Sequence, residues 1–164
     1  MLRLRLILAI ALMPALVPGM DAARAQDKGS VSPKPLPPLA NPNDPALAAK
    51  ELFGRKPQPA SLAARAIGFY AKGCLAGASA LPVNGETWQV MRLSRNRNWG
   101  HPDLVALLER LATKVRKVAG WPGLLVGDMS QPRGGPMLTG HASHQVGLDA
   151  AIWLPPMRNR LPSP

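Results

Sequence analysis

Hydrophobic and polar residues follow two different rhythms in the second half of the chain. Residues 86–93 (ETWQVMRL) alternate with a period of two, which predicts a strand, and residues 94–100 have the composition of a turn. Pro102 then suits the first position of a helix. Leucines recur after it at spacings of three and four residues, which predicts an amphipathic helix over residues 102–118; they are Leu104, Leu107, Leu108 and Leu111.

A short apolar run and a glycine-rich loop follow the predicted helix. Residues 124–126 (LLV) predict a buried strand, residues 130–140 predict a loop, and residues 148–154 predict a further strand. We therefore expect an α+β fold with a small mixed or antiparallel sheet and one main amphipathic helix. In such a fold the glycine-rich loop brings His141 and His144 to the edge of the sheet.

The N-terminal residues have the three parts of a secretory signal. Arg3 and Arg5 provide the positive region, residues 6–17 the apolar core, and Ala23 and Ala25 the small residues of a cleavage site. An apolar core of about 12 residues is too short to cross a hydrocarbon layer of ~30 Å. We predict a signal peptide over residues 1–25, export to the periplasm, and no stable membrane anchor after cleavage.

Proline dominates the next part of the chain. Eight prolines lie between Asp27 and Ser61, in a setting poor in β-branched and aromatic residues. This composition is typical of an extended tether, and it predicts a proline-rich linker over residues 26–62. Residues 45–52 have room for one or two helical turns within it. The folded domain is expected over residues 63–164.

Charge and cysteine content limit the choice of partners. Cleavage after Ala25 removes three arginines and one aspartate, so 17 basic and 8 acidic residues remain, a net charge of +9. Outside the inner membrane this charge favours cell-wall material or phosphorylated lipid over nucleic acid, or it serves only to keep the surface soluble. Cys74 has no partner cysteine in the chain, so it is either a buried apolar residue or half of a disulfide whose other half is absent.

Two of the three histidines lie in one short stretch, GHASHQVGLDAAIW (residues 140–153). Zinc binds imidazole nitrogen and carboxylate oxygen, and a loop histidine followed seven residues later by an acid is a workable ligand pair. The seventh residue after His144 is Ala151, which cannot bind a metal. Asp149 lies roughly 6.6 Å from that position along an extended strand, so we do not expect it to substitute. Spacing alone also fits two solvent-exposed histidines.

Three other residues are also considered for the site, and each has a simpler structural interpretation. His101, before the predicted helix, reads as a helix-entry residue rather than a ligand. Asp128 reads as a turn residue in preference to a partner for a histidine. Trp99, beside a glycine, is either a core residue or part of a substrate groove.

Two long segments from about Ser61 to Trp153 carry a family resemblance. They are GCLAGASALPVNGETWQVMRLSRNRNWGHPDLVALLERLA and GLLVGDMSQPRGGPMLTGHASHQVGLDAAIW, and they resemble the penicillin-insensitive murein endopeptidases, zinc peptidases related to the D-Ala-D-Ala carboxypeptidases. In that family the second segment reads S-H-Q-x-G-L-D-x-D-I. The resemblance implies that His144 is a zinc ligand and that His141 lies at the metal centre. It also implies that Ala151 occupies the position of an aspartate ligand.

The resemblance further implies a downstream H-x-H motif and a cysteine partner for Cys74, neither of which this chain contains. We therefore expect residues 63–164 to be a C-terminally truncated domain, incomplete relative to the family. The implied activity is cleavage of the D-alanyl-diaminopimelate cross-link of peptidoglycan by zinc-activated water, with β-lactams unable to trap the enzyme. With at most two ligands, His141 and His144, zinc binding is expected to be weak and this chain inactive. The alternatives are a catalytically dead periplasmic protein that binds peptidoglycan and the remnant of a disrupted gene.

Overall fold

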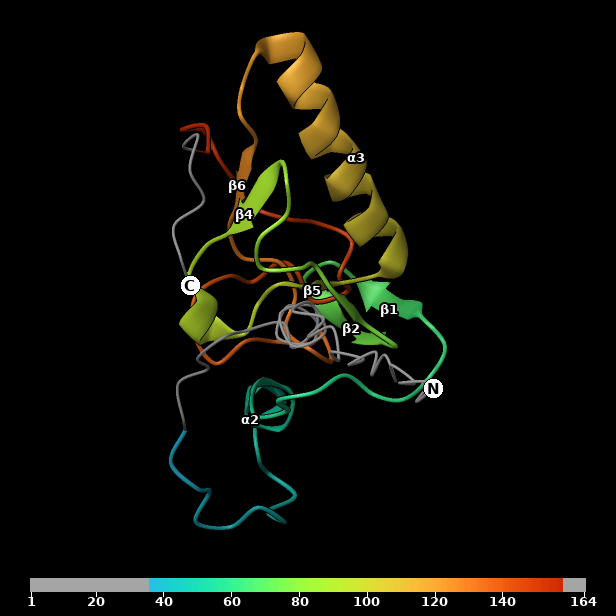
Figure 1. The fold of residues 1–164 in the computed structure, drawn as a ribbon. Helices are drawn as coiled ribbons and strands as arrows, with labels where there is room; N and C mark the ends of the chain where they lie inside the picture. Colours follow the sequence, from blue (N-terminus) through green and yellow to red (C-terminus); the bar gives the residue numbers. More distant parts are fainter. Residues whose placement is uncertain (1–35, 158–164) are drawn as a thin grey trace, which may run out of the picture.

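The computed structural model describes residues 36–157, which form small sheets around one long helix (Figure 1). The predicted signal peptide over residues 1–25 lies outside the described residues, as do the first part of the predicted linker and the last seven residues of the chain. No helix in the described part is long and apolar enough to cross a membrane. The predicted α+β class, with small mixed and antiparallel sheets and one main helix, is confirmed.

The main sheet has three short strands in the order β4-β6-β7. Strand β4 (Trp88–Val90) pairs parallel with β6 (Leu124–Val126), and β6 pairs antiparallel with β7 (Ile152–Trp153). The strand predicted over residues 86–93 is shorter than expected, because Arg92 adopts a left-handed conformation and the chain continues as the 3₁₀ helix η1 (Leu93–Arg95). The strand predicted over residues 148–154 is likewise only two residues long.

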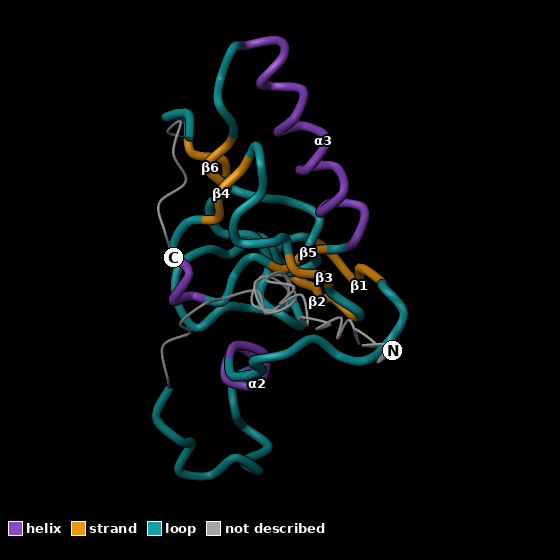
Figure 2. Tube along the Cα trace, viewed as in Figure 1, coloured by secondary structure: helices purple, strands orange, loops and turns teal. Residues whose placement is uncertain are grey.

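Two further sheets each contain two antiparallel strands. Strands β1 (Arg65–Phe69) and β2 (Lys72–Ala76) form a hairpin, and β3 (Ser79–Ala80) pairs with β5 (Trp99–Gly100). The sequence pattern had not indicated the hairpin. Most of the remaining chain is loop; β4 and β6 lie beside the long helix, and the strands of the two smaller sheets lie near its lower end (Figure 2).

Helix α3 (Pro102–Ala119) matches the predicted helix to within one residue at its C-terminal end. His101 caps its start, since His101 Nδ1 accepts a hydrogen bond from the Asp103 N–H at 3.3 Å. The helix packs on the main sheet and forms the larger hydrophobic core. Its buried residues are Leu104, Val105, Leu108 and Ala112, whereas Leu107 and Leu111 are exposed, contrary to the predicted apolar face.

The short helix α2 (Ala49–Gly54) falls within the predicted linker. It begins four residues later than the segment considered for helical turns, and it lies at the opposite end of the molecule from the C-terminus of α3 (Figure 1). It also contacts the folded part of the chain, since a Cβ on Gly135 would lie 2.4 Å from Phe53 Cγ. Described residues of the predicted linker therefore pack against the glycine-rich loop. The division into linker and domain stays a prediction.

Candidate functional site

The glycine-rich loop brings the two predicted site histidines together. The rings of His141 and His144 lie in an edge-to-face arrangement, with their centroids 4.9 Å apart. The side chain of His144 is buried, and that of His141 is 39% exposed. His144 has a φ of 67°, which a residue with a Cβ rarely adopts, so the loop holds this ring in place at a conformational cost.

A carboxylate lies beside each histidine. Asp128 Oδ2 is 3.4 Å from His141 Nε2, and Asp149 Oδ2 is 2.7 Å from His144 Nδ1. A carboxylate next to one ring nitrogen orients an imidazole and fixes its tautomer. His144 Nδ1 faces the carboxylate, so Nε2 is the ring nitrogen that can bind a ligand or a proton.

Asp128 is a buried charge centre, and its preferred reading as a turn residue was wrong. Its side chain is 2% exposed, and its Oδ2 accepts hydrogen bonds from Arg95 at 2.7 Å and Arg97 at 2.9 Å. Burial raises the pKa of the Asp128 carboxyl, but the hydrogen bonds and charges of Arg97 and Arg95 outweigh it and hold that pKa below its ordinary value. Asp128, which lies beside His141, is therefore a negatively charged carboxylate.

The hairpin β1–β2 supports the loop of residues 139–145, here called the histidine loop, through one buried side chain. The Gln145 amide accepts a hydrogen bond from the Gly73 N–H at 3.2 Å and donates to the carbonyls of Ala71 and Ala142, both at 2.9 Å. The Gln145 N–H also donates to the Tyr70 carbonyl at 3.1 Å. The residue after His144 is therefore fixed to the hairpin turn, which gives the hairpin a role in positioning the site.

A complete metal site does not form among residues 36–157. No three histidine, cysteine, aspartate or glutamate side chains in that range are placed to hold a metal ion. Ala151 lies beside the end of β6, where its N–H donates to the Asp128 carbonyl at 2.9 Å and its carbonyl accepts from the Gly127 N–H at 2.7 Å. Ala151 has no side-chain atom that can bind a metal, and two imidazoles do not match the three protein ligands that a catalytic zinc requires.

Two other residues considered from the sequence, Trp99 and Cys74, lie in strands β5 and β2. Trp99 is buried and belongs to the smaller hydrophobic core, so it does not line a groove. Cys74 is partly buried in β2, opposite Ile67 of β1.

Sequence reasoning missed Arg95 and Arg97. The sequence carried no specific signal for them, because two arginines in a turn (SRNRN) are equally typical of a solvated surface.

Comparison with known proteins gives the chain a family context. Residues 66–163 match the family model described as penicillin-insensitive murein endopeptidase. A relative of that name from Haemophilus influenzae is 58% identical over 88 residues, which are 54% of this chain and 30% of the relative. Relatives of the same name from Citrobacter koseri and Escherichia coli are 49% and 46% identical, over 60% and 59% of this chain and 35% of each relative. The chain thus spans about a third of the length of the curated relatives it matches.

Proposed function

Because this chain belongs to the penicillin-insensitive murein endopeptidase family, we propose that it recognises the cross-linked peptides of peptidoglycan. The bond at the histidine loop would be the D-alanyl-diaminopimelate cross-link, and the compartment would be the periplasm, where peptidoglycan lies. The family match over residues 66–163 supports this substrate class. The strong positive charge of the chain favours association with an acidic polymer.

We further propose that residues 1–164 by themselves bind this substrate without hydrolysing it. One observation carries this proposal: Ala151 occupies the position at which the family resemblance implies an aspartate ligand. Zinc would supply a polarised water when bound, but the described residues do not provide its three ligands. Hydrolysis is therefore not assigned to His141 or His144, which remain candidate ligands.

The substitution Ala151→Asp tests the ligand assignment. Adding a carboxylate at position 151 should raise zinc affinity roughly tenfold or more, since single changes around metal sites alter affinity by about 10 to 100 fold. Zinc bound by the purified chain would be measured by calorimetry and by metal analysis after dialysis. The matched control is Ala151→Asn, because the asparagine side chain has the same shape as aspartate but no negative charge. One equivalent of zinc held tightly by the unaltered chain would contradict the proposal.

Binding and cleavage of the polymer need separate assays. The unaltered chain should sediment together with purified sacculi. Chromatography of the soluble fraction should detect no released muropeptides. A cooperative thermal transition is expected as well, because a folded binding protein unfolds as a unit whereas an unfolded remnant does not. Chelator-sensitive release of muropeptides by the unaltered chain would refute inactivity, and failure to sediment with sacculi would refute recognition.

A further inference from the structure

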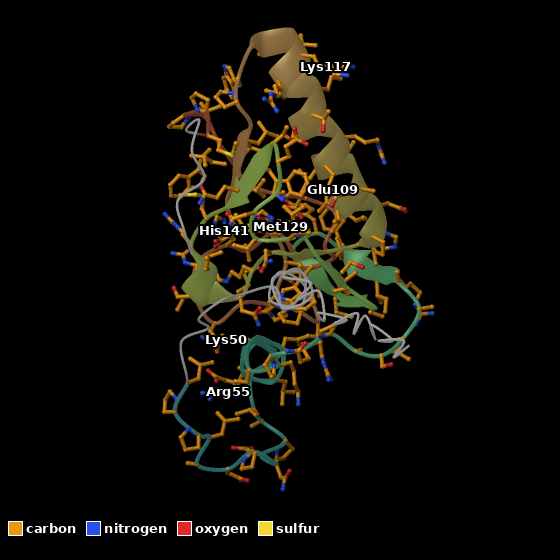
Figure 3. The ribbon with its side chains drawn as sticks, viewed as in Figure 1. Lys50, Arg55, Glu109, Lys117, Met129 and His141 are labelled. Carbon is orange, nitrogen blue, oxygen red and sulfur yellow. The ribbon has the colours of Figure 1, made fainter. Side chains whose placement is uncertain are left out.

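A basic pocket of about 480 Å³ lies between the segment around α2 and the turn that follows β4. One wall is formed by residues 54–57 and the other by residues 94–97, with Thr139 of the histidine loop also in the lining. Figure 3 shows Arg55 beside α2 and His141 near the lower ends of β4 and β6, while Lys117 lies at the far end of α3. The pocket therefore joins a part of the chain before the family match to the candidate site.

The lining of the basic pocket contains four cationic side chains and no acidic one; the cations are Arg55, Lys56, Arg95 and Arg97. Two carboxylates outside the lining pair with them. Glu51 lies 2.9 Å from Arg55, and Asp128 accepts from both Arg95 and Arg97. An excess of two positive charges remains among these six side chains, which favours an anionic ligand in a partly enclosed space.

The guanidinium groups keep unused donors. Arg95 and Arg97 share a single oxygen of Asp128, and Arg97 also donates to the Thr139 carbonyl at 2.6 Å. Among the described residues, the Arg95 side chain makes only the hydrogen bond to Asp128, although a guanidinium has five donors. The Arg95 side chain is 38% exposed, so its remaining donors are accessible to a ligand. A planar donor fork of this kind matches a carboxylate.

The turn that carries these arginines is strained and clamped. Arg92 and Asn96, which flank η1, have φ values of 56° and 53°, in the left-handed region that disfavours side chains. Asn96 Nδ2 donates to the Pro57 carbonyl at 3.2 Å, and Asn96 Oδ1 accepts from Trp99 Nε1 at 2.8 Å. The turn is thus fixed to the opposite wall of the pocket and to the core. Strain held by such contacts is typical of functional sites.

The basic pocket is also connected to the histidine pair. Asp128 Oδ2, which holds both arginines, is 3.4 Å from His141 Nε2, and Thr139 precedes His141 by two residues. A peptide bound with its cross-link at the histidines therefore passes beside this pocket. We infer that the basic pocket binds a free carboxylate of the peptidoglycan stem peptide, an inference that rests on the proposed function.

The proposal is tested by peptide binding to the full chain. The probe is the synthetic peptide L-Ala-γ-D-Glu-diaminopimelate-D-Ala, with Kd measured by calorimetry at low salt. Arg95→Gln should raise Kd roughly tenfold because it removes a charge-assisted hydrogen bond, and Lys56→Gln should raise it about threefold because its charge is exposed. Lys117→Gln removes the same charge at the other end of the molecule and should leave Kd unchanged.

Amidated peptides identify the carboxylate that enters the pocket. The peptide has three free carboxylates, so three probes are made, each amidated at one of them: the D-glutamate α-carboxyl, diaminopimelate or the terminal D-alanine. The amidation that weakens binding identifies the recognised carboxylate. Thermal unfolding verifies that Arg95→Gln is folded, and Lys56→Gln decides the result if it is not. Equal binding of all probes by all variants would overturn the subsite and leave the proposed function standing. Absence of peptide binding would also overturn it, and sedimentation with sacculi then reports separately on the proposed function.

Discussion

Asp128 contacts more residues of the candidate site than any other residue singled out from the sequence. Two arginines donate to one of its oxygens, a histidine lies beside that same oxygen, and the side chain is almost fully buried. Ordinary turn chemistry explains an aspartate after a strand, so the turn was preferred over the alternative of a histidine partner, and the two arginines were not anticipated. The role becomes visible only when the turn after β4 and the glycine-rich loop are placed together. Arg95, Arg97 and His141 then depend on one anion.

Asp128→Asn is expected to destabilise the fold. The substitution leaves Arg97, whose side chain is 9% exposed, without its anionic partner. Breaking a buried charge pair from one side costs up to about 3 to 5 kcal/mol, and the partial exposure of Arg95 reduces the expected loss in the free energy of unfolding to about 2 to 3 kcal/mol. Urea denaturation of the two proteins measures it. Asp103→Asn, at a side chain that is 90% exposed, should cost well under 1 kcal/mol; equal losses for both variants would argue against a special role for Asp128.

Helix α3 illustrates what periodicity predicts well and what it does not. Its bounds followed from Pro102 at the start and Gly120 after the end, where a left-handed residue closes the helix. Its buried face did not, because leucines occupy both the covered stripe and its border. Val105 and Ala112 pack inward, while Leu107 and Leu111 face outward. Hydrophobicity alone cannot separate these positions when the partner sheet is narrow.

A pair of leucine substitutions tests which face of α3 is buried. Leu108 is 5% exposed in the main core, whereas Leu107 is 51% exposed. Leu108→Ala should lower the free energy of unfolding by about 2 to 5 kcal/mol, because it opens a cavity in a packed interior. Leu107→Ala makes the same chemical change on the next residue and should cost less than about 1 kcal/mol. Chemical denaturation of the two variants compares them directly, and a larger loss for Leu107→Ala would invert the assignment of the faces.

The strands were harder to predict than the helix for a different reason. Strands β3, β5 and β7 are two residues long, too short for an alternating pattern to be detected. The hairpin β1–β2 is longer, yet Gly68 and Gly73 interrupt its apolar positions and much of β1 is exposed. A small mixed or antiparallel sheet was expected, but the parallel pairing of β4 with β6 was not specified. The position of the histidines followed from the loop composition, but the carboxylates and arginines around them required the three-dimensional arrangement.

At the scale of the whole molecule, α2 and the residues around it pack against the part that the family shares. The Asn96 side chain donates to the Pro57 carbonyl at 3.2 Å, and Arg133 donates to the Gln58 carbonyl at 3.3 Å. Phe53 lies against Gly135, which has a φ of 75° and no room for a Cβ. The segment around α2 is therefore packed against the part of the chain that the family model matches.

Gly135→Ala is expected to release α2. The added methyl would lie 2.4 Å from Phe53 Cγ, so the ring and the helix that carries it must move. Trypsin cleavage at Lys50 and Arg55, followed by mass spectrometry, should become several times faster. Gly120→Ala is the matched control, because Gly120 has a similar φ of 68° and nothing lies within 4 Å of the added Cβ. Both variants pay about 1 kcal/mol for the left-handed backbone, and only the first should change the cleavage rate. Unchanged cleavage in Gly135→Ala would mean that Phe53 does not hold α2 in place.

The two walls of the basic pocket have different origins along the chain. Residues 94–97 and Thr139 belong to the segment that the family model covers, whereas residues 54–57 precede it. The lining of the basic pocket therefore combines residues from two separate stretches of the sequence. If the pocket is the proposed carboxylate site, substitutions at Arg55 or Lys56 would alter the charge presented to the ligand without changing any residue within the matched range.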